Sequence, residues 1–422
     1  MAIFNKAFLV GSATAAFQVE GNNINSDTWV EEQLPHSGYE ERSFDAVDHY
    51  NHYEEDIKLM ADAGLNAYRF SLEWARIQPT PDTWDYNEIN HYKKVLECCH
   101  ANGIKPIVTL FHFTSPKWLI TLGGWENPKV IYYFTEYCKK VISELGDLME
   151  YVCTMNEANM RMQIAEILKE IGVLAQKEGN LQIGLNLQNN DFDLGEKEKA
   201  EAFGIQWPEK AYPFVSPCTD AGDKIVMLTH QAAKKAILEI NPNLKVGLTL
   251  TVHDVQSVEG GEKFAEKEWI DEFSHYLPYI KDDEFLGVQC YTRNRFDANG
   301  KMPPEEGVPL TQMGYEEYPD AVVNVVRRIA KEFKNDLIIT ENGIGTDNDE
   351  TRIEFIKRAT DGIAKCIEDG IPVKGYMYWS TFDNYEWQKG FSMTFGVVGV
   401  DRSTQTRHPK ESLYFLGSLL EK

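Results

Sequence analysis

The sequence predicts a closed barrel of eight parallel strands alternating with helices, a (β/α)8 barrel folded as a single domain with enlarged loops. Short apolar runs recur along all 422 residues, and longer segments with helical spacing separate them, which is the pattern of repeated βα units. No Pro/Ser linker, low-complexity tract or solenoid repeat divides the chain. A doubly wound open sheet is the alternative, and it is disfavoured because no Gly-rich nucleotide loop follows an early strand.

Each predicted strand is a short apolar run bounded by turn residues or polar clusters. In chain order the strands are Phe8–Ala13, Ala67–Leu72, Pro106–Phe111, Tyr151–Met155, Lys245–Thr251, Phe285–Tyr291, Leu337–Thr340 and Val373–Trp379. Helical spacing of apolar residues predicts helices at His49–Ala63, Tyr86–Ala101, Val130–Leu145, Lys224–Ile240, Pro319–Phe333 and Thr351–Asp369. Strands and helices in this alternation predict a strand barrel surrounded by helices.

Residues 160–224 depart from this alternation. An amphipathic helix begins the segment, and a polar, Asn-rich and charged stretch follows it. The apolar face of this helix comprises Ile164, Ile167, Leu168, Ile171 and Leu174. Because the segment follows a strand that ends in a glutamate, we expect an insertion over the catalytic face; a packed helix with a solvated loop is an equally simple interpretation.

The bulk composition excludes several classes of partner. The chain has 42 Lys and Arg against 66 Asp and Glu, a net charge of −24, which opposes binding to nucleic acid or to anionic membranes. Its seven cysteines are odd in number and show no CxxC spacing, so we expect free thiols, no metal site and a cytoplasmic protein. The apolar run at residues 7–10 is too short for a signal peptide, and no stretch reaches transmembrane length. A homo-oligomer remains open.

Two glutamates sit in matching contexts. Glu157 follows the apolar run Tyr151–Cys153, and Glu341 follows Leu337–Ile339. In a parallel barrel the C-terminal ends of the strands carry the active site, so both carboxylates are expected to face one substrate bond. The alternative for any single glutamate is a surface ion pair, which does not explain why both follow buried strands.

Paired carboxylates are the apparatus of glycoside hydrolysis. Retaining enzymes hold them about 5–5.5 Å apart, and inverting enzymes leave about 6.5–9.5 Å for a water molecule. Two neighbouring carboxylates also raise the pKa of one of them, so that one donates a proton while the other stays ionised. The sequence does not distinguish these separations.

Both glutamates lie in longer motifs. Thr154–Ala158 reads T-M-N-E-A, and Ile339–Gly343 reads I-T-E-N-G. Further motifs occur in order at Gly11–Thr14, Gln18, Glu20–Gly21, Tyr68–Ser71, Gly123–Trp125, Trp379–Trp387, Phe395–Val397 and Val400–Asp401. This set, which spans most of the chain, resembles family 1 of the glycoside hydrolases, the β-glucosidase-like retaining enzymes.

The resemblance implies roles residue by residue. Glu341 would be the nucleophile and Glu157 the acid/base, with Arg69 and Tyr291 holding Glu341. Asn156 would bind the sugar 2-hydroxyl. The remaining sugar contacts would come from Gln18, His112, Trp379, Glu386 and Trp387. The expected activity is that of an exo-β-glycosidase acting on a small-molecule glycoside without metal or organic cofactor.

Glu386 bears on the choice of substrate. The branch of the family that acts on 6-phosphoglycosides typically has serine at this position, and a carboxylate would repel a phosphate. We therefore expect a non-phosphorylated sugar, with glucose, galactose and fucose left open. A 6-phospho-β-glycosidase and a carbohydrate-binding pseudoenzyme are the alternatives. The chain departs from the family pattern at Phe113, Ala158, Gln289 and Cys290, and Thr251 stands where asparagine is common.

Overall fold

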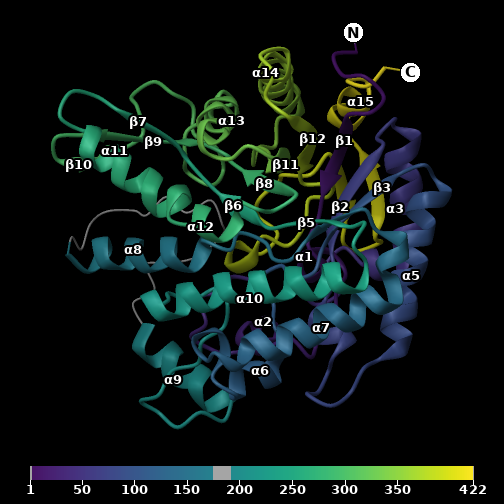
Figure 1. The fold of residues 1–422 in the computed structure, drawn as a ribbon, viewed down its shortest axis with the longest axis vertical. Coiled ribbons are helices and arrows are strands. Elements are labelled where there is room, and N and C mark those ends of the chain that lie inside the picture. The colour runs from purple at the N-terminus through teal and green to yellow at the C-terminus, as the bar shows by residue number, and fades with distance from the viewer. Residues whose placement is uncertain (1, 174–191, 422) are drawn as a thin grey trace.

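The computed structural model describes residues 2–173 and 192–421, and its central feature is a parallel sheet formed by all eight predicted strands (Figure 1). The strands are β1 (Leu9–Ala13), β2 (Ala67–Ser71), β3 (Lys105–Thr109), β4 (Tyr151–Cys153), β5 (Lys245–Gly247), β6 (Thr249–Thr251), β8 (Phe285–Gln289), β11 (Asp336–Asn342) and β12 (Val373–Trp379). β5 and β6 are one predicted strand interrupted at Leu248.

The sheet closes into a barrel at this interrupted strand. Its order is β5-β4-β3-β2-β1-β12-β11-β8-β6, so the two ends of the order are consecutive pieces of chain. Gly287 N–H donates to the carbonyl of Leu248 over 2.9 Å, and Glu284 N–H donates to that of Val246 over 3.2 Å. Closure leaves no unpaired sheet edge. The predicted (β/α)8, or TIM, barrel is confirmed.

The predicted helices form a ring around the barrel (Figure 1). They are α3 (His49–Asp62), α5 (Tyr86–Ala101), α7 (Lys129–Leu145), α10 (Asp220–Ile240), α13 (Ala321–Glu332) and α14 (Asp349–Glu368). Each helix packs on the barrel through an apolar face. In α13 this face comprises the buried residues Val322, Val325, Val326 and Ile329, which recur at helical spacing. The ends are set locally, for example where the Thr219 side chain accepts from Gly222 N–H at the start of α10.

Several short elements in the loops were not predicted. A small sheet contains β7 (Asp254–Ser257), β9 (Arg293–Asp297) and β10 (Gly300–Lys301), and a hairpin contains β13 (Val398–Asp401) and β14 (Thr406–Pro409). The short helices include α1 (Ala16–Val19), α2 (Asp27–Glu31), α4 (Trp74–Ile77), α6 (Lys117–Thr121), α11 (Glu262–Trp269), α12 (Leu277–Ile280) and α15 (Glu411–Gly417). Such elements are too short for a periodic sequence signal, because their formation depends on packing against the barrel.

The segment 160–224 contains α8 (Met160–Val173) and α9 (Phe192–Ala202), and residues 174–191, including Leu174 of the predicted apolar face, lie outside the described residues. Ile164 on the predicted apolar face is buried. α9 packs on loops at the C-terminal end of the barrel: Glu198 pairs with His36 over 2.7 Å, and Thr121 donates to the carbonyl of Phe203 over 3.1 Å. These contacts agree with an insertion near the catalytic face. The insertion and the single-domain organisation both stay predictions.

A buried aspartate in α2 joins the loops that follow β1 and β3. Asp27 N–H donates to the carbonyl of Ser115, and the Asp27 carboxylate accepts from Ser115 N–H over 2.9 Å. Burial and the neighbouring charge of Glu31 raise the pKa of Asp27 to about 8. In the folded protein Asp27 therefore keeps its proton at neutral pH.

Asp27→Asn is expected to flatten the pH dependence of stability between about pH 5 and pH 8. In this window an unfolded aspartate is ionised while folded Asp27 retains a proton. The free energy of unfolding therefore falls as pH rises, by up to about 1.4 kcal/mol per pH unit for one such group. Asparagine does not titrate. Urea unfolding across this range measures the slope, with exposed Asp82→Asn as the control; an unchanged slope in Asp27→Asn would contradict the prediction.

Candidate active site

The structure gathers all of the predicted site residues at the C-terminal end of the barrel. Each is at most 5% exposed, and each lies on a barrel strand or in the loop that follows it. They are Gln18, Arg69, His112, Asn156, Glu157, Tyr291, Glu341, Trp379, Glu386 and Trp387. Hydrogen bonds, an ion pair and ring contacts join seven of them in one chain of contacts from Tyr291 through His112 to the two tryptophans, and Gln18 and Glu386 form a separate bonded pair.

Glu341 is directed inward by a local irregularity of β11. Ile338 faces the barrel interior, so a regular period of two would also turn Thr340 inward and Glu341 outward. The register against β8 shifts between Ile339 and Glu341, where a bulge in the strand reverses this facing. The bulge therefore brings a carboxylate into the cavity that regular geometry would direct toward the helices.

The Glu341 carboxylate is held on both sides. Arg69 forms an ion pair with one carboxylate oxygen, and Tyr291 donates its hydroxyl to the other over 2.7 Å. Burial raises the pKa of Glu341, while the charge of Arg69 and the hydrogen bond from Tyr291 oppose that rise. These donors favour the ionised carboxylate, the form needed for nucleophilic attack.

Glu157 has a different environment. Burial, and then the negative charge of Glu341, raise the pKa of Glu157 well above its ordinary value. Its backbone is held at φ 40°, a left-handed conformation that is uncommon for a residue other than glycine, and its N–H donates to the Thr249 hydroxyl over 2.8 Å. Of the two carboxyl groups, Glu157 therefore has the environment that favours a retained proton, and Glu341 has the environment with more donors to an ionised form.

Asn156 connects the arginine to a histidine. Arg69 donates to Asn156 Oδ1 over 2.6 Å, and Asn156 Nδ2 lies 3.2 Å from His112 Nε2. Burial and the charge of Arg69 hold the pKa of His112 well below its ordinary value, so the ring is neutral. With Nε2 accepting from Asn156, the proton lies on Nδ1, which has no hydrogen-bond partner among the described residues. That N–H is available to a hydroxyl group of a ligand.

A second polar pair lies in the loops after β1 and β12. Gln18 Nε2 donates to the carbonyl of Tyr385 over 2.7 Å and to Glu386 over 3.2 Å. Within the described part of the chain, Gln18 Oε1 has no partner although the residue is fully buried. The pair thus offers acceptor oxygens at the base of the site.

Aromatic rings form a wall beside these polar groups. The planes of His112 and Trp379 lie within 17° with ring centroids 5.9 Å apart, and those of His112 and Trp387 lie within 15° at 6.3 Å. Phe113, where the family has tryptophan, contacts Trp387. Flat apolar rings next to hydrogen-bonding groups suit a sugar ring, which has C–H faces and hydroxyl edges.

The site also contains residues to which the sequence assigned no role. Gln289 Nε2 donates to Glu157 over 2.9 Å, and Thr251 also hydrogen-bonds this carboxylate. Arg69 is positioned by Thr109, whose hydroxyl accepts from its Nε over 3.0 Å. The sequence feature that could have identified Gln289 and Thr251 is their position, since each is the last residue of a barrel strand.

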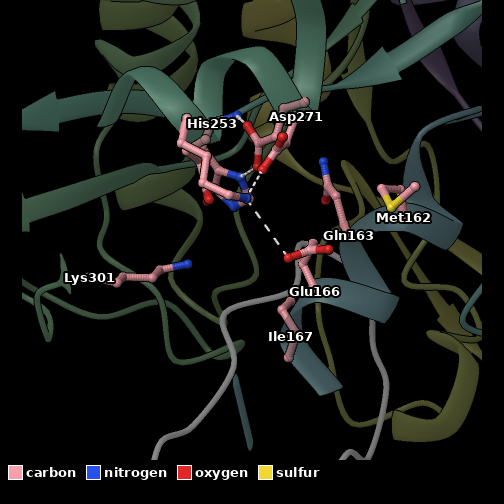
Figure 2. A pocket seen from close by; sticks show the side chains of 10 residues that line it. Met162, Gln163, Glu166, Ile167, His253, Asp271 and Lys301 are labelled. Carbon is pink, nitrogen blue, oxygen red and sulfur yellow. Dashed lines mark hydrogen bonds and ion pairs between the residues drawn. The ribbon is translucent and has the colours of Figure 1, made fainter. Parts of the chain in front are cut away.

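A cavity of about 60 Å³ lies between α8 and the π-helical turn η3 (Ile270–Ser274). Figure 2 shows side chains that line it. Gln163 from α8 donates to the carbonyl of Thr251 over 3.0 Å, which joins the cavity wall to the active site. His253 Nδ1 lies 2.6 Å from Glu272. Charged and apolar side chains thus line the cavity together, and Gln163 connects its wall to Thr251.

The same cavity holds a candidate group of metal ligands. Among the described residues, His253, Glu268 and Glu272 each offer a ligand atom within 4.8 Å of the other two. Lys267 already supplies a cation there: it pairs with Asp271, and Glu268 is among the charges that raise its pKa against the opposing effect of burial. The cluster residues already have protein partners, since His253 Nδ1 contacts Glu272 over 2.6 Å and Glu268 accepts from Asn294 over 3.0 Å. The predicted lack of a metal stays a prediction.

A (β/α)8 barrel with two buried carboxylates at its C-terminal end, one bound by arginine and tyrosine, defines a glycoside hydrolase. The family model of Glycosyl hydrolase family 1 matches residues 1–170 and 270–422. The chain belongs to this family and is an O-glycosyl hydrolase. The unmatched stretch includes most of the segment 160–224.

Individual relatives cover nearly the whole chain. The solved beta-glycosidase BGL167 is 41% identical with a TM-score of 0.90, covering 99% of this chain and 97% of that one. Beta-glucosidase A of Thermotoga maritima is 28% identical over 451 residues, covering 99% and 98%. A 6-phospho-beta-galactosidase of Staphylococcus haemolyticus is 27% identical over 478 residues, covering 98% and 97%. In the described residues we find no helix with the length and hydropathy needed to span a bilayer.

Proposed function

We propose that the protein is a retaining exo-β-glycosidase that releases a terminal, non-phosphorylated sugar from a small glycoside, as a β-glucosidase does. The observation that carries this is Gln289, whose side chain donates to Glu157 over 2.9 Å and whose backbone is paired with Glu341 across the sheet. The charge of Glu341 also raises the pKa of Glu157, which requires a short separation between the two carboxylates. That separation favours double displacement over the wider spacing that admits a water molecule.

The two steps follow from the electrostatics of the carboxylates. Glu341 attacks the anomeric carbon while Glu157 transfers its proton to the departing oxygen, which leaves a glycosyl ester on Glu341 and a negative charge on Glu157. Glu157 then takes a proton from water, whose oxygen attacks the anomeric carbon and releases Glu341. Arg69 and Tyr291 keep Glu341 ionised and oriented before the first step.

The sugar contacts are proposed from the polar atoms left available in the site. His112 Nδ1 and Gln18 Oε1 supply a donor and an acceptor, and both lack partners among the described residues. Asn156 would bind the 2-hydroxyl, Glu386 the outer hydroxyls, and Trp379 and Trp387 the apolar face of the ring. Hydrogen bonds that strengthen as positive charge develops on the sugar accelerate the reaction.

Glu386 favours a neutral sugar over a phosphorylated one. It is 5% exposed, it accepts a hydrogen bond from Gln18, and a phosphate at this position would meet a buried carboxylate. A 6-phospho-β-glycosidase is the second candidate, because a 6-phospho-beta-galactosidase is among the relatives. A carbohydrate-binding pseudoenzyme is disfavoured, since both carboxylates and the donors to Glu341 are present.

Assays with nitrophenyl β-glucoside, β-galactoside and β-fucoside, each compared with its 6-phosphate where one exists, test these alternatives. We expect kcat/KM for a neutral sugar to exceed that for its 6-phosphate by on the order of 100-fold, because a phosphate beside Glu386 juxtaposes like charges. A 2-deoxy-2-fluoro glycoside should label Glu341, as peptide mass spectrometry would show. Preference for the phosphate would establish the second candidate, and binding without labelling or turnover would indicate a pseudoenzyme.

A cytoplasmic location is part of the same proposal. All seven cysteines lie in the described part of the chain as free thiols, and Cys99, Cys138, Cys153, Cys290 and Cys366 are buried. Free thiols are typical of a reducing compartment. The homo-oligomer stays a prediction.

A further inference from the structure

Sheet register places Gln289 between the two carboxylates. It is the last residue of β8 and is fully buried. Across the sheet it is paired with Glu341 on β11 and with Thr251 on β6, and the Thr251 side chain hydrogen-bonds Glu157. The backbone positions therefore hold Gln289 between Glu341 and Thr251, the residue that contacts Glu157.

The Gln289 side chain uses this position as a donor. Its Nε2 donates to Glu157 Oε1 over 2.9 Å, and the same side chain lowers the pKa of Glu341, its neighbour across the sheet. Its Oε1 has no hydrogen-bond partner among the residues described, although the side chain is buried. Leaving a buried acceptor unpaired costs free energy. The Gln289 side chain nevertheless adopts this orientation because it directs the amide N–H group toward the two carboxylates.

We propose that Gln289 is a positioning residue that shares one amide donor between the two carboxylates, so that this donor follows the negative charge from Glu341 to Glu157 during turnover. The inference rests on the double displacement proposed above. Before the first step the charge lies on Glu341. Once the sugar is bound to Glu341 as an ester, Glu341 is neutral and the charge lies on Glu157.

The two carboxylates depend on Gln289 to different extents. Glu341 retains Arg69 and Tyr291 as donors when Gln289 is replaced. Glu157 relies on Gln289 and Thr251, and Arg69 affects it through charge. A donor to a carboxylate stabilises the ionised form, so its removal raises the pKa of both groups, and that of Glu157 by more.

The experiment is the pH dependence of kcat/KM for wild type, Gln289→Met and Gln289→Asn. Methionine matches the length of glutamine without a donor. In the kcat/KM profile of Gln289→Met we expect the basic limb, which reports the pKa of Glu157, to move up by about one pH unit. The acidic limb, which reports the pKa of Glu341, should move up by less. Gln289→Asn keeps an amide on a side chain one methylene shorter, so an intermediate shift is expected.

A second readout separates positioning from general loss of activity. Gln289→Met should lose on the order of 10- to 100-fold in kcat/KM with an alkyl glycoside, whose leaving group needs a proton, and much less with a dinitrophenyl glycoside. Gln78→Met is the matched control: Gln78 is a buried glutamine bonded to Trp74 and to the carbonyl of Pro81, and both pH limbs should stay at wild-type positions.

Thermal unfolding verifies that each variant is folded. If Gln289→Met does not fold, Gln289→Asn replaces it. The positioning role would be overturned if the folded Gln289→Met variant kept both limbs of its pH profile at the wild-type positions. It would also be overturned if the variant lost equal activity on the alkyl and the dinitrophenyl glycoside. Neither result would contradict the glycosidase activity itself. A wild-type protein that turns over none of the glycosides would instead remove the proposed function, and this inference with it.

Discussion

Glu341→Ala is expected to lower kcat for an aryl β-glycoside by on the order of 10⁵-fold, since it removes the group that forms the covalent intermediate. The fold should persist at reduced stability, because Arg69 is fully buried and loses its ion-pair partner. Azide is small enough to enter the space left by the carboxylate. It should restore turnover and give the α-glycosyl azide, with inverted configuration, from a β-glycoside.

Steady-state kinetics and product analysis by NMR measure both effects. Glu316→Ala is the matched control, because Glu316 is a buried glutamate paired with Arg293 as Glu341 is with Arg69. It should lose stability without a comparable loss of kcat. Activity of Glu341→Ala within a factor of about ten of wild type would show that another group attacks the sugar.

Glu157→Ala is expected to separate good from poor leaving groups. For alkyl glycosides kcat/KM should fall on the order of 10³-fold, because the departing oxygen no longer receives a proton. For a dinitrophenyl glycoside the first step should be almost unchanged, since that leaving group departs as an anion. The glycosyl-enzyme should then accumulate, because water lacks its base, and a burst of dinitrophenol should be visible.

The pH profile supplies an independent check on Glu157. Burial and the charge of Glu341 raise the pKa of Glu157, so in wild type the acid form is lost, and activity falls, only as pH rises through that elevated value. Glu157→Ala should therefore lack the basic limb of the kcat/KM profile measured with a dinitrophenyl glycoside. Azide should yield the β-azide here, with retained configuration. Equal losses for both leaving groups would exclude Glu157 as the proton donor.

The strands and principal helices could be predicted from the sequence because their signals are local. Tyr151–Cys153 and Leu337–Ile339 are apolar runs between polar segments, and α13 repeats valine and isoleucine at the spacing of one helix face. The interruption at Leu248 could not be predicted, because it divides one apolar run and arises where the barrel closes. The loop elements were missed for a similar reason, since short helices and strands are stabilised mainly by tertiary contacts.

The residues of the candidate site likewise differ in whether the sequence could predict their roles. Both glutamates could be placed at strand ends, and motif resemblance suggested Arg69 and Tyr291 as partners of Glu341. Gln289 was noted only as a departure from the family pattern. Its contact with Glu157 and its pairing with Glu341 depend on the register of three strands that are distant in sequence.

The alternation of strands and helices and the two acidic strand ends follow from local sequence patterns, because apolar periodicity and turn residues act over a few neighbours. The direction in which those side chains face depends instead on contacts between distant strands. A bulge in β11 turns Glu341 into the barrel, and closure at β5 and β6 brings Thr251 and Gln289 against Glu157. Facing and proximity are properties of register and closure, and these are set by contacts between distant segments.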